Sequence, residues 1–356
     1  MTVTTGAGAT AGTGRPAPAP ANPSVTMTGS GEPEQCVELT DAGRPSAGRG
    51  KVVVEVEAAG VSYAEVQMLQ HLHPFPPRFP FVPGYDLVGR ITEVGEGVTG
   101  WRAGDRVAAM PRYGAWQRHV EVPAKVLAPV PDGLDAAEAV SLVTNGVTAW
   151  QMVHRLSGAR PGDTVLVHGA SGGVGTLLTQ IAVHHGLRVI GTASPAKHDA
   201  VRALGAEPLD YRTPDFPSAV RALAPEGVAA VFDHIGGKGL DDGWAVLAPG
   251  GTLVSFDSSV AGYEPGQWFR PHVPALRRTL THALARLFGR TGGRRMRMYY
   301  VKPGKDFDAD LGAMYELLAR GVLRPEIAGR LPLGESAAAL RALLDGRAVG
   351  KYVLVP

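Results

Sequence analysis

Two hydrophobic patterns divide the chain near residue 135. From about 25 to 130, short alternating or apolar runs lie between turns rich in glycine and proline, a pattern typical of β-strands. The runs that predict strands are 51–61, 87–95, 104–110 and 119–130. This part of the chain therefore predicts a compact, mostly antiparallel β domain.

Beyond residue 135, apolar runs alternate with stretches of helical periodicity. The predicted helices are 135–156, 174–186, 196–204, 306–320 and 335–346. The predicted strands are 164–169, 188–193, 209–211, 229–236, 251–258 and 351–356. Strands separated by helices form right-handed βαβ units and a parallel sheet. We expect the last strand to return to the β domain.

These patterns predict an α/β protein of two domains. Residues 25–145 and 303–356 would form the β domain, and 146–302 would form a parallel-sheet domain that binds a nucleotide. Residues 1–24 consist mainly of Thr, Ala, Gly and Pro, a composition that cannot bury enough apolar surface to fold. We expect a disordered tail there, although a start codon assigned too far upstream would explain the segment equally well.

Composition narrows the functional classes. The chain has 356 residues, one Cys and a formal net charge of +2. A single Cys excludes an internal disulfide framework and a structural zinc site with several thiolates. The charge gives no argument for nucleic-acid binding. No secretory signal or apolar run of about 20 residues is present, so we expect a cytoplasmic protein without integral membrane association.

A glycine-rich loop follows the predicted strand 164–169 and opens the predicted helix 174–186. In GASGGVG (169–175), Ala170, Gly172 and Gly175 fit the three small-residue positions of a dinucleotide-binding fingerprint. The chemistry needs a tight turn, close approach of pyrophosphate to backbone, and a helix N-terminus facing the phosphates. We therefore predict cofactor contacts from the loop; its other members are Ser171, Gly173 and Val174.

The end of the next predicted strand, 188–193, indicates which dinucleotide binds. An NAD enzyme usually carries Asp or Glu about 20 residues beyond the loop, to hold the ribose hydroxyls. The corresponding stretch, 191–198, has no acid. Instead Ser194 offers a hydroxyl, Lys197 a cation where a 2′-phosphate would lie, and Tyr211 a second hydroxyl. NADPH therefore fits better than NADH, unless Lys197 is only a solvated residue at a helix start.

Several segments resemble one known family in their order along the chain. They are AAGVSYAEV (58–66), the run from Pro80 to Val107, HGASGGVG (168–175), SPAKHDAVRALGAE (194–207) and VGKYVLVP (349–356). They are similar to the medium-chain dehydrogenase/reductases, in the zinc-independent quinone oxidoreductase-like branch. The resemblance implies a GroES-like β domain, a Rossmann domain, an active site in the cleft between them, hydride transfer, and a homodimer.

The resemblance also bears on metal and acceptor. Zinc-dependent relatives carry Cys in the segment matching VSYAE and Gly-His-Glu where this chain has Gly84, Tyr85 and Asp86. Ser62 and Tyr85 stand at the ligand positions, and Cys36 lies well upstream, so we predict no metal site. Without a Lewis acid, reduction of an activated small-molecule acceptor is favoured: a quinone, an enone or an enoyl thioester.

Candidate catalytic residues follow from the same resemblance. Enoyl reductases of this superfamily place a proton-donating tyrosine where this chain has His73, which could act as an acid near neutral pH or be an exposed loop residue. Tyr63 and Tyr85 are rival donors or pocket walls. Ser62 replaces an asparagine of quinone oxidoreductases and could donate to a carbonyl. Near the nicotinamide we expect four residues: Thr144, Thr148, Phe256 and Ser258.

Residues 259–297 are least like the family. Segment 273–298 carries seven Arg and no acid, and Val273, Leu276, Leu280, Leu284 and Leu287 follow helical spacing. This basic helix could be a lid or dimer contact with a solvated Arg face, a site for an acyl carrier or CoA, or a membrane-surface helix. The main prediction is an NADPH-dependent reductase. The alternative is a non-catalytic, NADPH-binding protein that engages a membrane or RNA through this insertion.

Overall fold

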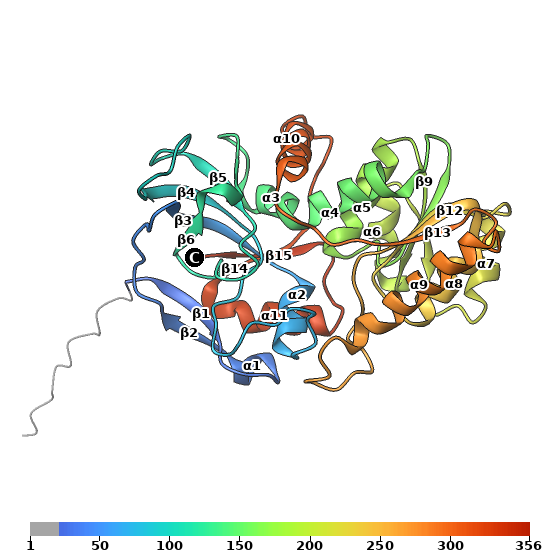
Figure 1. Ribbon diagram of the computed structural model, residues 1–356, viewed down its shortest axis with the longest axis horizontal. Helices are drawn as coiled ribbons and strands as arrows, with labels where there is room; N and C mark the ends of the chain where they lie inside the picture. Colours follow the sequence, from blue (N-terminus) through green and yellow to red (C-terminus); the bar gives the residue numbers. More distant parts are fainter. Residues whose placement is uncertain (1–20) are drawn as a thin grey trace, which may run out of the picture.

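Two sheets carry the fold in the computed structural model, which describes residues 21–356. Figure 1 shows them side by side, with the antiparallel sheet on the left and the parallel sheet on the right. Most of the predicted tail lies outside the described residues. At its end, however, Asn22 is fully buried and β1 (Pro23–Met27) begins, so the folded part starts earlier than the predicted residue 25.

The left-hand domain is built on a seven-stranded sheet. Its strands are β3 (Lys51–Val61), β4 (Leu87–Val94), β5 (Arg106–Ala109), β6 (His119–Pro123), β7 (Leu127–Pro129), β14 (Ile327–Pro332) and β15 (Lys351–Val355). The last strand, β15, pairs antiparallel with β3, which confirms that the end of the chain returns to this domain. A separate two-stranded ribbon, β1 with β2 (Val37–Asp41), extends it.

The right-hand domain is a six-stranded parallel sheet in the order β10-β9-β8-β11-β12-β13. Its strands are β8 (Thr164–Val167), β9 (Arg188–Ala193), β10 (Glu207–Asp210), β11 (Val228–Asp233), β12 (Leu247–Ser255) and β13 (Arg295–Met298). Strand order reverses between β8 and β11, which is where a doubly wound sheet binds a dinucleotide. The predicted pairing of a GroES-like domain with a Rossmann domain is confirmed.

Helices alternate with these strands much as the hydrophobic pattern predicts. They are α5 (Gly173–His184), α6 (His198–Ala203), α7 (Phe216–Leu223) and α8 (Lys238–Val246). The predicted insertion 259–297 contains α9 (Val273–Leu287), but its last residues belong to β13, which pairs with β12. The insertion therefore ends earlier than predicted, because residues 295–298 add a strand to the sheet edge.

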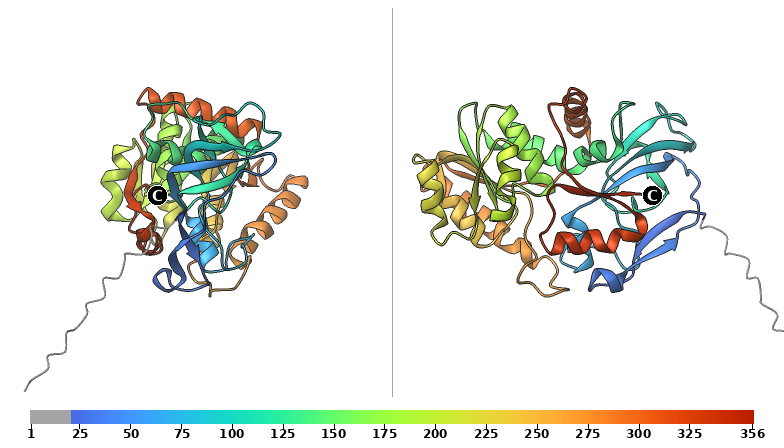
Figure 2. Two further views of the ribbon diagram at one scale, coloured as in Figure 1. Left: turned by 90° about the vertical axis from the view of Figure 1, so that its left-hand side faces the viewer. Right: turned by 180° about the vertical axis from the view of Figure 1, so that it is seen from behind.

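A continuous helical segment joins the two domains. The predicted helix 135–156 is present as α3 (Ala136–Ser141) and α4 (Val147–Gln151), each followed by a π-helical turn. Above it lies α10 (Lys305–Ala319), visible between the domains in both figures (Figures 1 and 2). Within residues 21–356, every helix is too short or too polar to cross a bilayer.

Three shorter helices complete the left-hand domain: α1 (Pro33–Cys36), α2 (Tyr63–Leu69) and α11 (Ser336–Leu344). Of these, α2 matters most for the site, because its buried residues Val66 and Leu69 fix it on the sheet. One apolar cluster also runs from α3 and α4 into the parallel sheet and α10. The two domains thus share an apolar core, which fixes their position relative to one another.

Candidate functional site

The phosphate loop (residues 169–175) follows β8 and opens α5, as predicted. A Cβ on Gly175 would lie 2.0 Å from the carbonyl oxygen of Gly169, so only glycine fits there. A Cβ on Gly172 would meet only that same oxygen, at 3.4 Å. The loop is therefore closed on its helix side and open at Gly172. An open face beside a helix N-terminus fits a pyrophosphate.

The end of the chain supports this loop from the other domain. The backbone N–H of Gly350 donates to the carbonyl oxygen of Ser171 at 2.9 Å. Gly350 has a left-handed φ of 82°, and a Cβ there would lie 2.0 Å from the carbonyl oxygen of Glu326. Glycine is therefore required at this contact. The segment just before β15 thus holds the phosphate loop in place.

Two predicted cofactor residues present buried hydroxyls that lack a partner. The Oγ1 of Thr144, in the π-helical turn after α3, and the Oγ of Ser258, after β12, make no hydrogen bond within the described structure. Buried polar atoms normally find partners, so such orphans indicate where a ligand would bind. Thr148 is buried one turn further along the helix, and Phe256 is partly buried at the end of β12.

The other end of the predicted cofactor site lies at the carboxyl ends of β9 and β10. Ser194 is partly exposed and precedes a short helical turn, and Tyr211 is 52% exposed. The ammonium of Lys197 donates to the carbonyl oxygens of Gly346 and Ala348, at 2.6 and 2.7 Å. This lysine is therefore held at the site, with one remaining N–H available for an anion.

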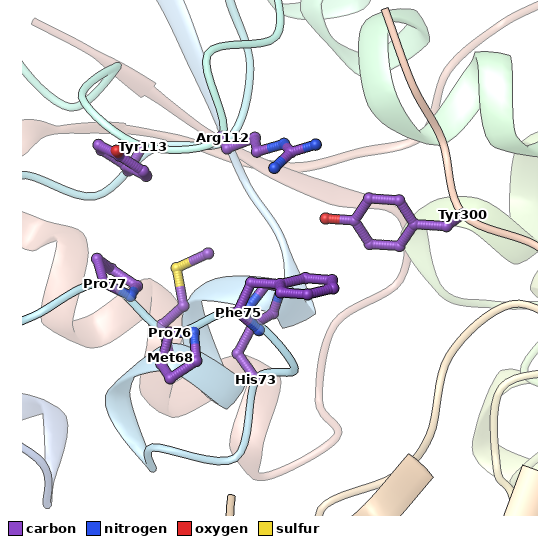
Figure 3. Close-up of a pocket in the computed structure, with 8 residues that line it drawn as sticks. All are labelled: Met68, His73, Phe75, Pro76, Pro77, Arg112, Tyr113 and Tyr300. Atoms are coloured by element: carbon purple, nitrogen blue, oxygen red, sulfur yellow. Dashed lines mark hydrogen bonds between the residues drawn. The ribbon is translucent and has the colours of Figure 1, made fainter. Parts of the chain in front are cut away.

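The acceptor cleft is a cavity of about 260 Å³ between the domains, and Figure 3 shows its walls. The eight lining residues come from three segments: Met68, His73, Phe75, Pro76, Pro77, Arg112, Tyr113 and Tyr300. Phe75, Arg112 and Tyr300 point toward one another across it. Apolar and aromatic walls with a few polar groups are typical of a pocket for a small, flat organic molecule.

Arg112 is the cation of this cleft. Its guanidinium lies 6.0 Å from the centre of the Tyr300 ring, and no carboxylate of the described residues lies within ion-pair distance. Its backbone is left-handed (φ 76°), a costly conformation for a residue with a side chain. Such strain is concentrated at ligand sites, so Arg112 is well placed to meet negative charge on a bound molecule.

His73 lines the same cleft but differs from both sequence interpretations. It is only 5% exposed, so it is not a solvated loop residue. Burial lowers its pKa to about 4, so the ring is neutral at physiological pH and cannot act as the imidazolium acid that the sequence suggested. Its Nδ1 accepts a hydrogen bond from the N–H of Phe75 at 3.2 Å, which leaves the ring proton on Nε2 as a donor.

Tyr63 is the first residue of α2, whereas Tyr85 lies in the segment between α2 and β4. Tyr85 is 3% exposed, and its hydroxyl hydrogen bonds to that of Tyr300, across the domain boundary. Burial raises its pKa, which makes it a weaker acid than a free tyrosine. The hydroxyl of Tyr63 instead accepts from the N–H of Val260 at 3.4 Å, on the loop after β12. Tyr85 thus contacts Tyr300 in the wall of the cleft, and Tyr63 is directed toward that loop.

Ser62 caps the start of α2, and its hydroxyl is occupied. Its Oγ and its backbone N–H both donate to the carboxylate of Glu65, at 2.5 and 2.8 Å. Glu65 is fully buried, and burial raises its pKa to about 7. Asp86 lies close by and accepts from Lys351 at 2.8 Å. Of the two positions that hold zinc ligands in relatives, Ser62 is thus hydrogen bonded to Glu65 and Tyr85 to Tyr300, which leaves Ser62 less free to reach a carbonyl.

Several site residues carried no sequence signal that we used. Phe75 and Arg112 lie 37 positions apart and Tyr300 lies a further 188 positions along the chain, and only the fold brings the three together. Gln67 was also missed: its side-chain amide donates to Asp257 at 2.7 Å and to the carbonyl oxygen of Ser258 at 3.0 Å. This contact ties α2 to the loop that carries a predicted cofactor residue.

The ligands that a metal ion would need do not come together among the described residues. Among residues 21–356, no group of three or more His, Cys, Asp or Glu lies close enough to hold an ion. A zinc site needs three or four such ligands in tetrahedral geometry. The described residues therefore do not fit a zinc ion.

Comparison with known proteins places the chain in a family. Residues 48–132 match the model "alcohol dehydrogenase GroES-like domain", and 204–354 match "zinc-binding dehydrogenase". The human synaptic vesicle membrane protein VAT-1 homolog is 32% identical over 327 residues, covering 88% of this chain and 81% of that protein. The chain belongs to the medium-chain dehydrogenase/reductases, in their quinone oxidoreductase-like branch. It is thus an oxidoreductase, and the resemblance found in its sequence is confirmed.

Solved structures agree with this assignment. A mycobacterial protein solved in complex with NADPH is 29% identical, with a TM-score of 0.80, covering 94% of this chain and all of that one. The quinone oxidoreductase of Coxiella burnetii is 26% identical, with a TM-score of 0.79, covering 94% and 99%. Both likenesses span the two domains and the cleft between them.

Proposed function

We propose that this chain transfers hydride from NADPH to a small conjugated carbonyl compound, either a quinone or an enone-type acceptor. The observation that carries the proposal is the acceptor cleft, where Arg112, a cation with no carboxylate partner among the described residues, faces aromatic walls. Relatives support it, because one is solved with NADPH and another is the quinone oxidoreductase of Coxiella burnetii.

The residues present fit the cofactor. The phosphate loop would bind the pyrophosphate over Gly172, and Lys197 with Ser194 and Tyr211 would bind the 2′-phosphate end. The orphaned hydroxyls of Thr144 and Ser258 would donate to the nicotinamide end. When bound there, the cofactor supplies a hydride, which carries two electrons to the acceptor.

The cleft residues then have two tasks. Hydride addition to a conjugated carbonyl moves negative charge onto the carbonyl oxygen, and a fixed cation stabilises that charge more in the transition state than in the ground state. Arg112 supplies the cation, while the Nε2–H of His73 and the Tyr85–Tyr300 hydroxyl pair supply hydrogen-bond donors. An enone or enoyl thioester then takes a proton at its α carbon, and a quinone takes its proton on oxygen.

A panel of acceptors tests the proposal. NADPH oxidation would be followed with 1,4-naphthoquinone, 2-cyclohexenone and crotonyl-CoA, in deuterated water and with product analysis. We expect turnover of at least one acceptor, with deuterium at the α carbon of an enone or thioester product. Cofactor binding by titration, with no oxidation by any acceptor, would instead favour the non-catalytic alternative.

A further inference from the structure

Helix α9 carries its apolar stripe on the outside of the molecule. The five positions that predicted an amphipathic helix are Val273, Leu276, Leu280, Leu284 and Leu287, and their side chains are 41 to 80% exposed. Phe288, directly after the helix, is 76% exposed. Figure 2 (left) shows this orange helix standing out from the body of the protein. The stripe therefore does not belong to the protein's own core.

The opposite side of the helix is fixed to the protein. Arg278 forms an ion pair with Asp241 of α8, with Nε 2.6 Å from Oδ1. His282 stacks on Trp244, also of α8, with ring centres 3.6 Å apart, and Ala275 is buried. These contacts hold the helix in one rotation. The outward direction of the leucines is thus set by specific packing.

Cationic side chains border the stripe. At about 100° per residue, the five apolar positions span an arc of only about 80°. Arg277 falls about 20° beyond one edge of this arc and Arg286 about 80° beyond the other edge, and both are exposed. Neither these two nor Arg290 lies within ion-pair distance of a carboxylate among residues 21–356, and segment 273–298 contains no acid. Apolar side chains flanked by unpaired cations fit an apolar layer beneath anionic groups.

We propose that the outer face of α9 binds the surface of an anionic membrane. The leucines and Phe288 would enter the acyl boundary, and Arg277, Arg286 and Arg290 would meet lipid phosphates. Charge argues against a second copy of the chain as the occupant. A two-fold contact through this face would bring the same arginines together from both copies, with no acid of the segment to pair them.

Vesicle flotation with the full-length chain tests this proposal. We expect binding to vesicles of equal parts phosphatidylcholine and phosphatidylglycerol, and little binding to pure phosphatidylcholine. Leu280→Glu should weaken the binding at least about tenfold, because it removes an apolar side chain proposed to enter the membrane and adds a charge that anionic lipids repel. Leu39→Glu is the matched control, because Leu39 is 58% exposed on β2 and Leu280 is 59% exposed. Arg277→Gln should make the binding weaker and less sensitive to salt.

Three results would overturn the proposal. One is the absence of binding to phosphatidylglycerol vesicles, and another is equal binding by wild type and Leu280→Glu. The third is a drop from dimer to monomer in Leu280→Glu, by light scattering, without vesicle binding in the wild type; it would assign the face to a second copy. NADPH titration of each variant checks its fold, and none of the substituted residues lies in the cofactor or acceptor site.

Discussion

The phosphate loop is built from one segment, 169–175, whereas the walls of the acceptor cleft come from three segments in two domains. The loop is proposed to bind the cofactor through its backbone, and its shape depends on Gly175, where there is no room for a Cβ. The cleft works through side chains, among them Arg112 and Tyr300. The loop is therefore expected to tolerate almost no change, while the cleft can alter its acceptor through single substitutions.

The largest expected effect comes from adding one methyl group to the loop. In Gly175→Ala the new Cβ would lie 2.0 Å from the oxygen of Gly169, so loop and helix must separate. We expect a loss of about 2 kcal/mol or more in unfolding free energy, together with loss of NADPH binding. Thermal unfolding and fluorescence titration measure the two.

Gly172→Ala is the matched control for that substitution. Its Cβ meets only one atom within 4 Å, the Gly169 oxygen at 3.4 Å, so the fold should be kept. The methyl group would stand where the pyrophosphate is proposed to bind, so NADPH affinity should fall while stability stays. Equal binding by Gly172→Ala and wild type would show that the open face of the loop is not the phosphate site.

A smaller effect is expected at the other end of the cofactor site. Lys197→Ala should raise the dissociation constant of NADPH about tenfold and leave that of NADH nearly unchanged, because only NADPH carries the 2′-phosphate. Lys125→Ala, at an exposed lysine on the other domain, is the control. If both cofactors weaken equally, Lys197 acts only by holding the carbonyl oxygens of Gly346 and Ala348.

The pH dependence of stability tests the environment of the cleft. Burial lowers the pKa of His73 from 6.5 to about 4, so the unfolded chain binds a proton more readily than the native one. This histidine therefore does not alter the unfolding free energy above about pH 6.5, and lowers it by up to about 3 kcal/mol as pH falls toward 4, because only the unfolded chain takes up the proton. His73→Gln should flatten urea-unfolding stability over that range. His184→Gln is the control. If stability depends on pH as steeply in His73→Gln as in His184→Gln, the burial of His73 does not contribute to the pH dependence.

Features formed by neighbouring residues were predicted well from the sequence, whereas features formed by distant segments were predicted poorly. The phosphate loop was recognised because its strand, glycines and helix adjoin, and the return of β15 to the β domain was expected from a strand pattern at the end of the chain. Arg112 was missed, because nothing near it marks a cleft that only the paired domains create. The spacing in α9 predicted an amphipathic helix correctly, but periodicity cannot say whether an apolar face packs inward or outward.

Burial explains the remaining differences. His73 looked like a loop residue able to act as an acid, and its desolvation became visible only once α2 and the facing domain enclosed it. Likewise the hydroxyl of Ser62 looked available to a substrate, but it donates a hydrogen bond to the buried carboxylate of Glu65. In both cases the residue type was informative, and the three-dimensional environment changed its chemistry.

Arg112 is proposed to stabilise the charge that develops on the acceptor oxygen during hydride transfer. The most direct measurement is the single-turnover rate of NADPH oxidation by an acceptor that the wild type reduces, compared with Arg112→Gln. We expect the rate to fall about 100-fold while the dissociation constant of NADPH stays the same, with partial recovery in Arg112→Lys. Arg102→Gln, at a surface arginine, should leave the rate unchanged. An unaltered single-turnover rate in Arg112→Gln would contradict the claim.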